Sequence, residues 1–324
     1  MESDWSGITL DEFLAAHWPR IAKGKLRDLV RAGDINVDGM AAKPSDKLRY
    51  GQVVLVEADM SALKEIATHK MDFQVLYQDE HLVAVNKPAG IPVEPSRWGE
   101  HPLHLGGALL DWAEQKQEEG PLEQRPRGLH RLDLGTSGVM MYALSLEAER
   151  YYRGLFASRM IDKTYHALVV GEVSEGGTID APLAPDRSRS GTMRVDDRGK
   201  ASVTDYVPME RFRGYSLVEA HPRTGRTHQI RVHLASIGHP LMVDPTYGGS
   251  ESMLLSHLKS GYRPKKGQVE RPLMDRLTLH AKAVRLVPFG GSEEITIEAD
   301  YPKDFRIALD KLRRWRPFRA NHYS

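Results

Sequence analysis

The chain has 324 residues, of which 40% are hydrophobic, and 45 basic against 44 acidic side chains leave a formal net charge of +1. This balance predicts a soluble globular protein with one large and one small domain. The absence of cysteine excludes disulfides, thiolate catalysis and cysteine-ligated zinc. No signal peptide and no bilayer-spanning apolar run is apparent, so we expect a cytoplasmic protein without membrane contact.

Residues 8–57 are patterned as a compact α/β module. Apolar residues at helical spacing follow Thr9, and a second amphipathic stretch over 23–32 stops at Gly33, a typical helix end. Alternating residues interrupted at Asp38-Gly39 predict a hairpin, and a closing strand follows at 48–58.

The polar stretch 58–71 predicts a linker, which divides the chain into domains at residues 1–70 and 71–324. From Phe73 onward strand-like runs dominate, with helices expected at 103–117 and 146–159. Runs of strands with occasional helices predict a mixed α+β domain with a largely antiparallel sheet. The polar and basic stretch 184–200 is expected to be an exposed loop, and residues 313–324 form a basic end of the chain.

The stretch "GLHRLDLGTSGVMMYALS", residues 128–145, places His130, Arg131 and Asp133 before a Gly-Thr-Ser-Gly turn. A nearby cation favours the ionised carboxylate, and the glycines would allow a tight turn and close approach of a ligand. Asp133 is therefore either a turn-capping residue or an acid held for chemistry.

A second motif, "HPRTGRTHQIRVHLASIGHP", covers residues 221–240 and predicts a helix that opens near Thr227. Arg226 would lie at the helix entrance and Arg231 one turn further on. The basic residues indicate either an anion-binding helix end or a solvated face. The motif also contains four histidines that leave a metal site as an alternative, although no zinc signature is present: His221, His228, His233 and His239.

Two weaker signals lie on predicted strands. In "KTYHALVVGEV" Tyr165 could stack on a base or simply pack in the core. In "HLVAVNKPAGIPVEPS" Lys87 stands beside a Pro-Gly turn, where it could contact phosphate or end a buried strand.

Together these motifs resemble the RluA-type pseudouridine synthases, in order and spacing, over roughly residues 73–312. The stretch from Thr9 to Glu57 resembles a small αL RNA-binding module found in a ribosomal protein. The resemblance implies isomerisation of uridine to pseudouridine in structured RNA, without cofactor or metal. Large-subunit ribosomal RNA is the expected target and transfer RNA the alternative. We expect the protein to be a monomer.

By motif position the resemblance implies that Asp133 is the catalytic aspartate, acting as nucleophile or as base at the sugar. Arg231 is the candidate for its ion-pair partner and Arg226 the competing one. Tyr165 is expected to stack on the target uracil, and Arg131 to fill the space left by the flipped nucleotide.

The expected RNA-holding cations are Lys87, His130, the basic stretch 187–200 and, in the N-terminal module, Lys23, Lys25 and Arg27. Two other functions compete with the isomerase: an RNA-binding protein of the same fold without catalysis, and a metal-dependent hydrolase built on the histidines. The presence of Asp133 together with the arginines and Tyr165 argues against an RNA-binding protein without catalysis. A metal-dependent hydrolase would lose its activity when a chelator is added.

Overall fold

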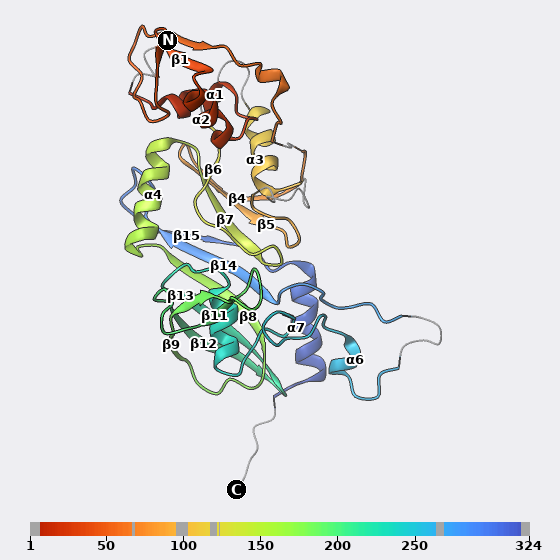
Figure 1. Ribbon diagram of the computed structural model, residues 1–324. Coiled ribbons are helices and arrows are strands. Elements are labelled where there is room, and N and C mark those ends of the chain that lie inside the picture. The colour runs from red at the N-terminus through yellow and green to blue at the C-terminus, as the bar shows by residue number, and fades with distance from the viewer. Residues whose placement is uncertain are drawn as a thin grey trace. The chain divides into compact units, whose positions relative to one another are not determined.

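The computed structural model describes residues 7–66, 69–94, 103–116, 122, 124–263 and 269–318 (Figure 1). The chain divides into two compact units. The first comprises Met1–Asp72, Pro92–Gly128 and Tyr142–Glu149, and the second Phe73–Ile91, Leu129–Met141 and Arg150–Ser324. These units follow contacts rather than chain order, so they differ from the predicted division into residues 1–70 and 71–324.

The N-terminal part of the first unit has the predicted order of elements. Helices α1 (Leu10–His17) and α2 (Lys23–Ala32) share one apolar core with the strands, and Gly33 ends α2 in the left-handed conformation. Strand β1 (Ile35–Val37) pairs antiparallel with β2 (Met40–Ala41) and β3 (Val54–Val56). Asp38 and Gly39 form the β1–β2 turn with φ of 54° and 75°, which suits an Asp-Gly hairpin.

Residues 58–66 pack on this module and differ from the predicted linker. Asp59 caps the short 3-10 helix η2 (Met60–Ala62) by accepting the Ser61 and Ala62 N–H groups. Met60 and Leu63 contact the apolar core, and the Ile66 N–H donates to the Arg20 carbonyl at 2.6 Å. The remainder of the predicted linker includes residues 67–68, which lie outside the described residues.

Both helices predicted between residues 100 and 160 are present. Helix α3 (Leu105–Glu114) begins at His104, whose ring accepts the Gly107 N–H at 2.9 Å. Helix α4 (Leu146–Ser158) begins after Ser145, whose hydroxyl accepts the Ala148 N–H at 3.1 Å. Strand β6 (Arg127–Gly128) pairs with Tyr142 and Ala143 within the first unit.

A mixed sheet with strand order β4-β5-β7-β14-β8-β13-β12-β9 organises the second unit, and β15 pairs with β14 (Figure 1). The strands are β4 (Gln74–Gln78), β5 (Leu82–Lys87), β7 (Ser137–Ala143), β8 (Asp162–Val170), β9 (Gly177–Asp180), β12 (Val203–Phe212), β13 (Tyr215–Pro222), β14 (Leu279–Leu286) and β15 (Ile295–Glu298). Strand β14 runs parallel to β7 and antiparallel to β8, and β13 is antiparallel to β8 and β12. The predicted α+β class with a largely antiparallel sheet is confirmed.

Glycine is required where β14 meets the start of β7. A Cβ atom on Gly138 would lie 2.1 Å from the Ala281 carbonyl oxygen, and its φ of 116° disfavours other residues. A Cβ on Gly135 would lie 2.9 Å from Leu277 Cγ. The glycines of this turn therefore admit a neighbouring strand, where the sequence suggested that they admit a ligand.

Helices cover the two faces of the sheet. Helix α5 (Gln229–Ser236) packs Ile230 and Leu234 on the face that carries Ala167 and Val169 of β8. On the face that carries Leu168 of β8, helix α7 (Lys303–Trp315) packs its apolar side, Phe305, Ala308, Leu309 and Leu312. Successive strand residues point to opposite faces, so α5 and α7 lie on opposite sides of the sheet.

Several elements were not predicted. They are β6, β9, β12, β14, α7 and the short helix α6 (Leu255–Leu258). The stretch 184–200 was expected to be a loop, but it contains a hairpin of β10 (Leu183–Pro185) and β11 (Met193–Val195). Residues 319–324 of the basic end lie outside the described residues. Within the part of the chain that the structure describes, no helix is long and apolar enough to cross a membrane.

Candidate active site

Asp133 lies in the turn that leads into β7. Its backbone carbonyl accepts the Thr136 N–H at 3.0 Å, which closes the turn. Its carboxylate instead reaches Arg231, from which it is separated by 98 residues in sequence, and Arg231 Nη1 donates to Asp133 Oδ2 at 2.9 Å. The turn is thus held by the main chain, and the Asp133 side chain, 25% exposed, remains available for chemistry.

Arg231 is fixed by a second carboxylate. Its Nε and Nη2 donate to the two oxygens of Asp244 at 2.7 and 2.9 Å. The side chains of Arg231 and Asp244 are only 7% and 1% exposed. Burial alone would lower the pKa of Arg231, but the two carboxylates outweigh this and raise it. A bidentate pair orients the planar guanidinium, so that Nη1 is aimed at Asp133.

The competing arginine has another partner. Arg226 is exposed, and its Nε donates to the Ala201 carbonyl at 3.2 Å. Of the two candidates, the structure therefore pairs Arg231 with Asp133.

Tyr165 comes from the middle of β8, on the face covered by α5. Burial and the neighbouring Asp133 raise the pKa of its hydroxyl, so the ring is neutral and close to the carboxylate. Its cross-strand neighbours are Ala220 on β13 and Ala281 on β14. The structure therefore places Tyr165, Asp133 and Arg231 in one site.

Lys87 differs from the prediction of a phosphate contact. Its side chain is fully buried, and Nζ donates to the carbonyls of Pro88 (2.9 Å), Ile91 (2.7 Å) and Leu134 (3.3 Å). Burial and the nearby Arg276 lower the pKa of Lys87 to about 7. Its ammonium thus ties the loop after β5 to the residue that follows Asp133.

His130 also differs from the predicted phosphate contact. Its Nε2 accepts the Met141 N–H at 3.2 Å, and its ring packs on Phe156. Burial and the neighbouring Lys163 lower the pKa of His130 to about 3, so the ring is neutral at neutral pH. A neutral imidazole cannot act as a cation for phosphate, and His130 instead supports the strand behind Asp133.

Exposed cations remain near the sheet. Arg131 is exposed two residues before Asp133. The basic hairpin, residues 183–200, exposes Arg187, Arg189, Arg194 and Arg198, and Arg194 also pairs with Asp196 at 2.6 Å. Their exposure leaves these side chains accessible to a ligand, and their contact with RNA stays a prediction.

In the N-terminal module two of the three predicted RNA-holding cations are committed to carboxylates. Arg27 donates to buried Asp11 at 2.7 Å, and Lys23 pairs with both Asp11 and Glu12. Lys25 is exposed, and the Arg27 side chain remains 43% exposed despite its pairing. The three cations thus differ in their surroundings, and their predicted contact with RNA stays a prediction.

The four histidines of residues 221–240 do not gather. His221 contacts Glu219, His233 contacts Thr204 and the Ala181 carbonyl, and His239 contacts the Val170 carbonyl. His228 contacts Tyr247. Among the described residues no group of three His, Asp or Glu side chains is placed to hold a metal ion.

Two residues of the site, Asp244 and Tyr247, were not singled out from the sequence, and His228 was considered only as a possible metal ligand. Asp244 ends a buried apolar run, Leu241–Val243, and an acid in that position is a usable signal. His228 Nε2 lies 3.9 Å from Asp133 Oδ1, and the Tyr247 ring lies 4.9 Å from the Arg231 guanidinium. No periodicity connects these residues, and only the fold does.

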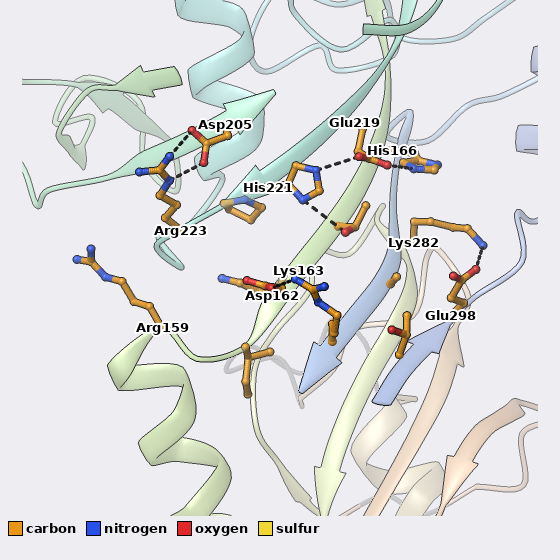
Figure 2. Close-up of a pocket in the computed structure, with 16 residues that line it drawn as sticks. Arg159, Asp162, Lys163, His166, Asp205, Glu219, His221, Arg223, Lys282 and Glu298 are labelled. Carbon is orange, nitrogen blue, oxygen red and sulfur yellow. Dashed lines mark hydrogen bonds and ion pairs between the residues drawn. The ribbon is translucent and has the colours of Figure 1, made fainter. Parts of the chain in front are cut away.

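A separate hollow of about 740 Å³ lies on the opposite face of the sheet (Figure 2). It contains Thr164 and His166, which alternate with Tyr165 along β8. Its charges are largely paired within the hollow, as Arg223 with Asp205 and Lys282 with Glu298 (Figure 2). This reverse-face hollow is therefore no part of the Asp133 site.

The arrangement supplies one free acid. Hydrolysis of a glycosidic bond usually needs two carboxylates. Here both oxygens of Asp244 are occupied by Arg231, so Asp133 is left as the partly exposed carboxylate beside an aromatic ring. Such a site is compatible with the reaction that the resemblance to the pseudouridine synthases implies, in which the leaving base returns to the sugar and no water is activated.

Comparison with known proteins agrees with this chemistry. The family described as RNA pseudouridylate synthase matches residues 81–236. The ribosomal large subunit pseudouridine synthase D of Pseudomonas aeruginosa is 32% identical over 314 residues, covering 95% of this chain and 92% of that protein. The proteins of the same name from Xanthomonas campestris and Escherichia coli are 33% and 31% identical, each over 95% of this chain and 90% and 91% of their own length.

Solved structures show the same relationship. The human RNA pseudouridylate synthase domain containing 4 superposes with a TM-score of 0.56 at 28% identity, over 74% of this chain and 93% of that one. The chain belongs to the RNA pseudouridylate synthase family. It is thus an isomerase that acts on RNA.

Proposed function

We propose that this protein isomerises uridines of large-subunit ribosomal RNA to pseudouridine. The observation that carries the reaction is the Asp133 carboxylate, held by Arg231 beside Tyr165. Support for the target comes from relatives in three bacteria whose names specify the ribosomal large subunit and which align over at least nine-tenths of their length.

The reaction exchanges one bond of the nucleotide for another. The bond from the ribose carbon to uracil N1 breaks, the uracil turns, and a bond from the same ribose carbon to C5 forms. The C5 proton leaves to solvent and N1 gains a proton, so atoms and electrons balance. Asp133 acts at the sugar as nucleophile or as base, while Arg231 keeps its carboxylate in place and Tyr165 stacks on the uracil.

RNA binding is assigned to exposed cations. A base within a duplex must be extruded to reach Asp133, and Arg131, exposed beside it, is suited to fill the vacated space. The basic hairpin and Lys25 are suited to hold phosphates. We also propose that the protein works as a monomer in the cytoplasm on ribosomal RNA.

The test is pseudouridine mapping by carbodiimide treatment and primer extension, on total RNA from cells with and without the gene. We expect stops at specific large-subunit ribosomal uridines to disappear, and to return with the wild type but not with Asp133→Asn. If stops vanish only from transfer RNA, the substrate is transfer RNA and not ribosomal RNA. Unchanged stops in both RNAs would favour an RNA-binding protein without catalysis.

A further inference from the structure

Tyr247 joins three parts of the second unit through one side chain. Its hydroxyl accepts the Met193 N–H of β11 at 2.8 Å and lies 2.8 Å from His228 Nδ1. Its ring lies 4.9 Å from the Arg231 guanidinium carbon, within cation–π range. Tyr247 therefore contacts the basic hairpin, the residue that precedes α5, and the arginine that holds Asp133.

The contacts around His228 favour one of its two neutral tautomers. With the Met193 N–H as one donor to the tyrosine oxygen, the hydroxyl hydrogen is free to point at His228 Nδ1. Nδ1 is then an acceptor and Nε2 carries the ring proton. The opposite tautomer would direct a lone pair of Nε2 at Asp133 Oδ1, 3.9 Å away, which is unfavourable beside a carboxylate.

The backbone of His228 is also held in an uncommon conformation. Its φ of 55° and ψ of 18° are left-handed, which costs a non-glycine residue free energy. Such a conformation persists where the surroundings fix it, and here it directs the imidazole toward both Tyr247 and Asp133.

We propose that Tyr247 is a positioning residue that keeps His228 as the Nε2–H tautomer facing the Asp133 oxygen that Arg231 does not bind. In the free enzyme the gap between His228 Nε2 and Asp133 Oδ1 is 3.9 Å. Hydrogen bonds of active sites are often long before substrate binds and shorten in the complex. Closure of this gap on RNA binding would leave both Asp133 oxygens held, one by Arg231 and one by His228. This role rests on the proposed function.

The first test is spectroscopic and needs no RNA. Long-range proton–nitrogen correlation spectra of protein labelled with nitrogen-15 in histidine report the tautomer of each ring through its pattern of cross-peaks. The pattern that disappears in His228→Gln belongs to His228. We expect the Nε2–H form in the wild type and a mixture with the Nδ1–H form in Tyr247→Phe. A wild-type ring in the Nδ1–H form, or a pattern unchanged in Tyr247→Phe, overturns the proposal.

The second test is kinetic. Release of tritium from uridine C5 in a transcript of large-subunit ribosomal RNA reports turnover. Tyr247→Phe keeps the ring over Arg231 and removes only the hydroxyl, so kcat should fall about tenfold, about the worth of one hydrogen bond, with KM within about twofold. An unchanged kcat despite an altered tautomer overturns the positioning role.

The matched control is Tyr301→Phe. The Tyr301 hydroxyl also bonds a histidine Nδ1, that of His166, but on the reverse face of the sheet. We expect it to alter the His166 pattern and leave kcat within about twofold, and an equal fall of kcat in both variants would overturn the specific role of Tyr247. If the wild-type protein releases no tritium, the proposed function is overturned. The cross-peak pattern of His228 would still show whether Tyr247 fixes its tautomer, because that test needs no RNA.

Discussion

The two faces of the sheet carry similar sets of side chains with different consequences. On the α5 face His228 lies between Asp133 and Tyr247. On the reverse face His166 lies between Glu219, 3.1 Å from its Nε2, and the Tyr301 hydroxyl at its Nδ1. Each set is a carboxylate, a histidine and a tyrosine, but only the first contains the proposed catalytic acid.

The two sets differ in how many oxygens of the carboxylate are already bound by other side chains. Glu219 bonds both His166 and His221, so its two oxygens are occupied (Figure 2). Burial raises the pKa of Glu219, but these hydrogen bonds outweigh it and lower the pKa overall. Asp133 is held on one oxygen by an arginine that Asp244 fixes, and its other oxygen faces His228 across a gap. A reactive carboxylate is thus held on one side and left open on the other.

The largest expected effect comes from removing the charge of each acid in turn. Asp133→Asn should lower kcat at least about 10⁴-fold, because the proposed nucleophile or base is lost, while RNA binding stays within a few fold. Glu219→Gln, made on the reverse face, should leave turnover within about twofold. Tritium release and filter binding measure the two properties. Appreciable turnover by Asp133→Asn would contradict the mechanism.

The second largest effect is expected when the planar guanidinium of Arg231 is replaced by an ammonium group. Arg231→Lys keeps a positive charge, but a single ammonium cannot bind Asp244 with two hydrogen bonds and also reach Asp133. We expect kcat to fall about 10²-fold, and stability to fall by about 3 kcal/mol, because Asp244 stays buried with fewer partners. The matched variant is Arg223→Lys, in an exposed pair with Asp205. It should change neither turnover nor the midpoint of urea unfolding, and parallel losses would refute the distinction.

The third prediction concerns the dependence of stability on pH. It involves His280, the histidine beside His166 on the reverse face. His280 of β14 pairs with His166 across the strands, and its ring bonds the Ser137 hydroxyl at 2.9 Å and the Ala299 carbonyl at 3.2 Å. Burial lowers its pKa to about 4. The unfolded chain, with a His280 pKa near 6.5, therefore binds the proton more readily, so stability falls as pH drops from about 6.5 toward 4.

From pH 7 to pH 5 this one group should remove about 2 kcal/mol of unfolding free energy. His280→Gln can keep both hydrogen bonds without titrating, and its urea unfolding should show a decline smaller by that amount. Equal declines in the wild type and His280→Gln would show that His280 does not titrate as described.

Elements defined by local signals were predictable. The Asp38-Gly39 hairpin, the end of α2 at Gly33 and the start of α4 at Ser145 each follow from the residues at that position. The apolar spacing of Phe305, Leu309 and Leu312 would also have predicted α7, but the basic residues around it suggested a tail. The sequence therefore contained the α7 signal, although it was not recognised.

The site was predictable only in part. The ion pair of Asp133 with Arg231 joins residues 98 apart, and no periodicity links them, so the resemblance in motif supplied it. Lys87 and His130 were assigned to phosphates because charge is visible in sequence and burial is not. The need for glycine at position 138 depends on the approach of β14, which the chain reaches about 140 residues later. These features depend on tertiary contacts between distant segments.

The smallest expected effect separates the N-terminal cations. Lys25 is exposed, so Lys25→Ala should weaken RNA binding a few fold at low salt and reduce the slope of log affinity against log salt by about one. Lys23 is paired with Asp11 and Glu12, so Lys23→Ala should instead lower the stability of the module, because two carboxylates that are at most 10% exposed lose a partner. Salt titrations of binding, with urea unfolding of both variants, measure the two outcomes. A reduced salt slope in Lys23→Ala at unchanged stability would show that this lysine leaves its carboxylates to meet RNA, and the distinction between held and free cations would then fail in this module.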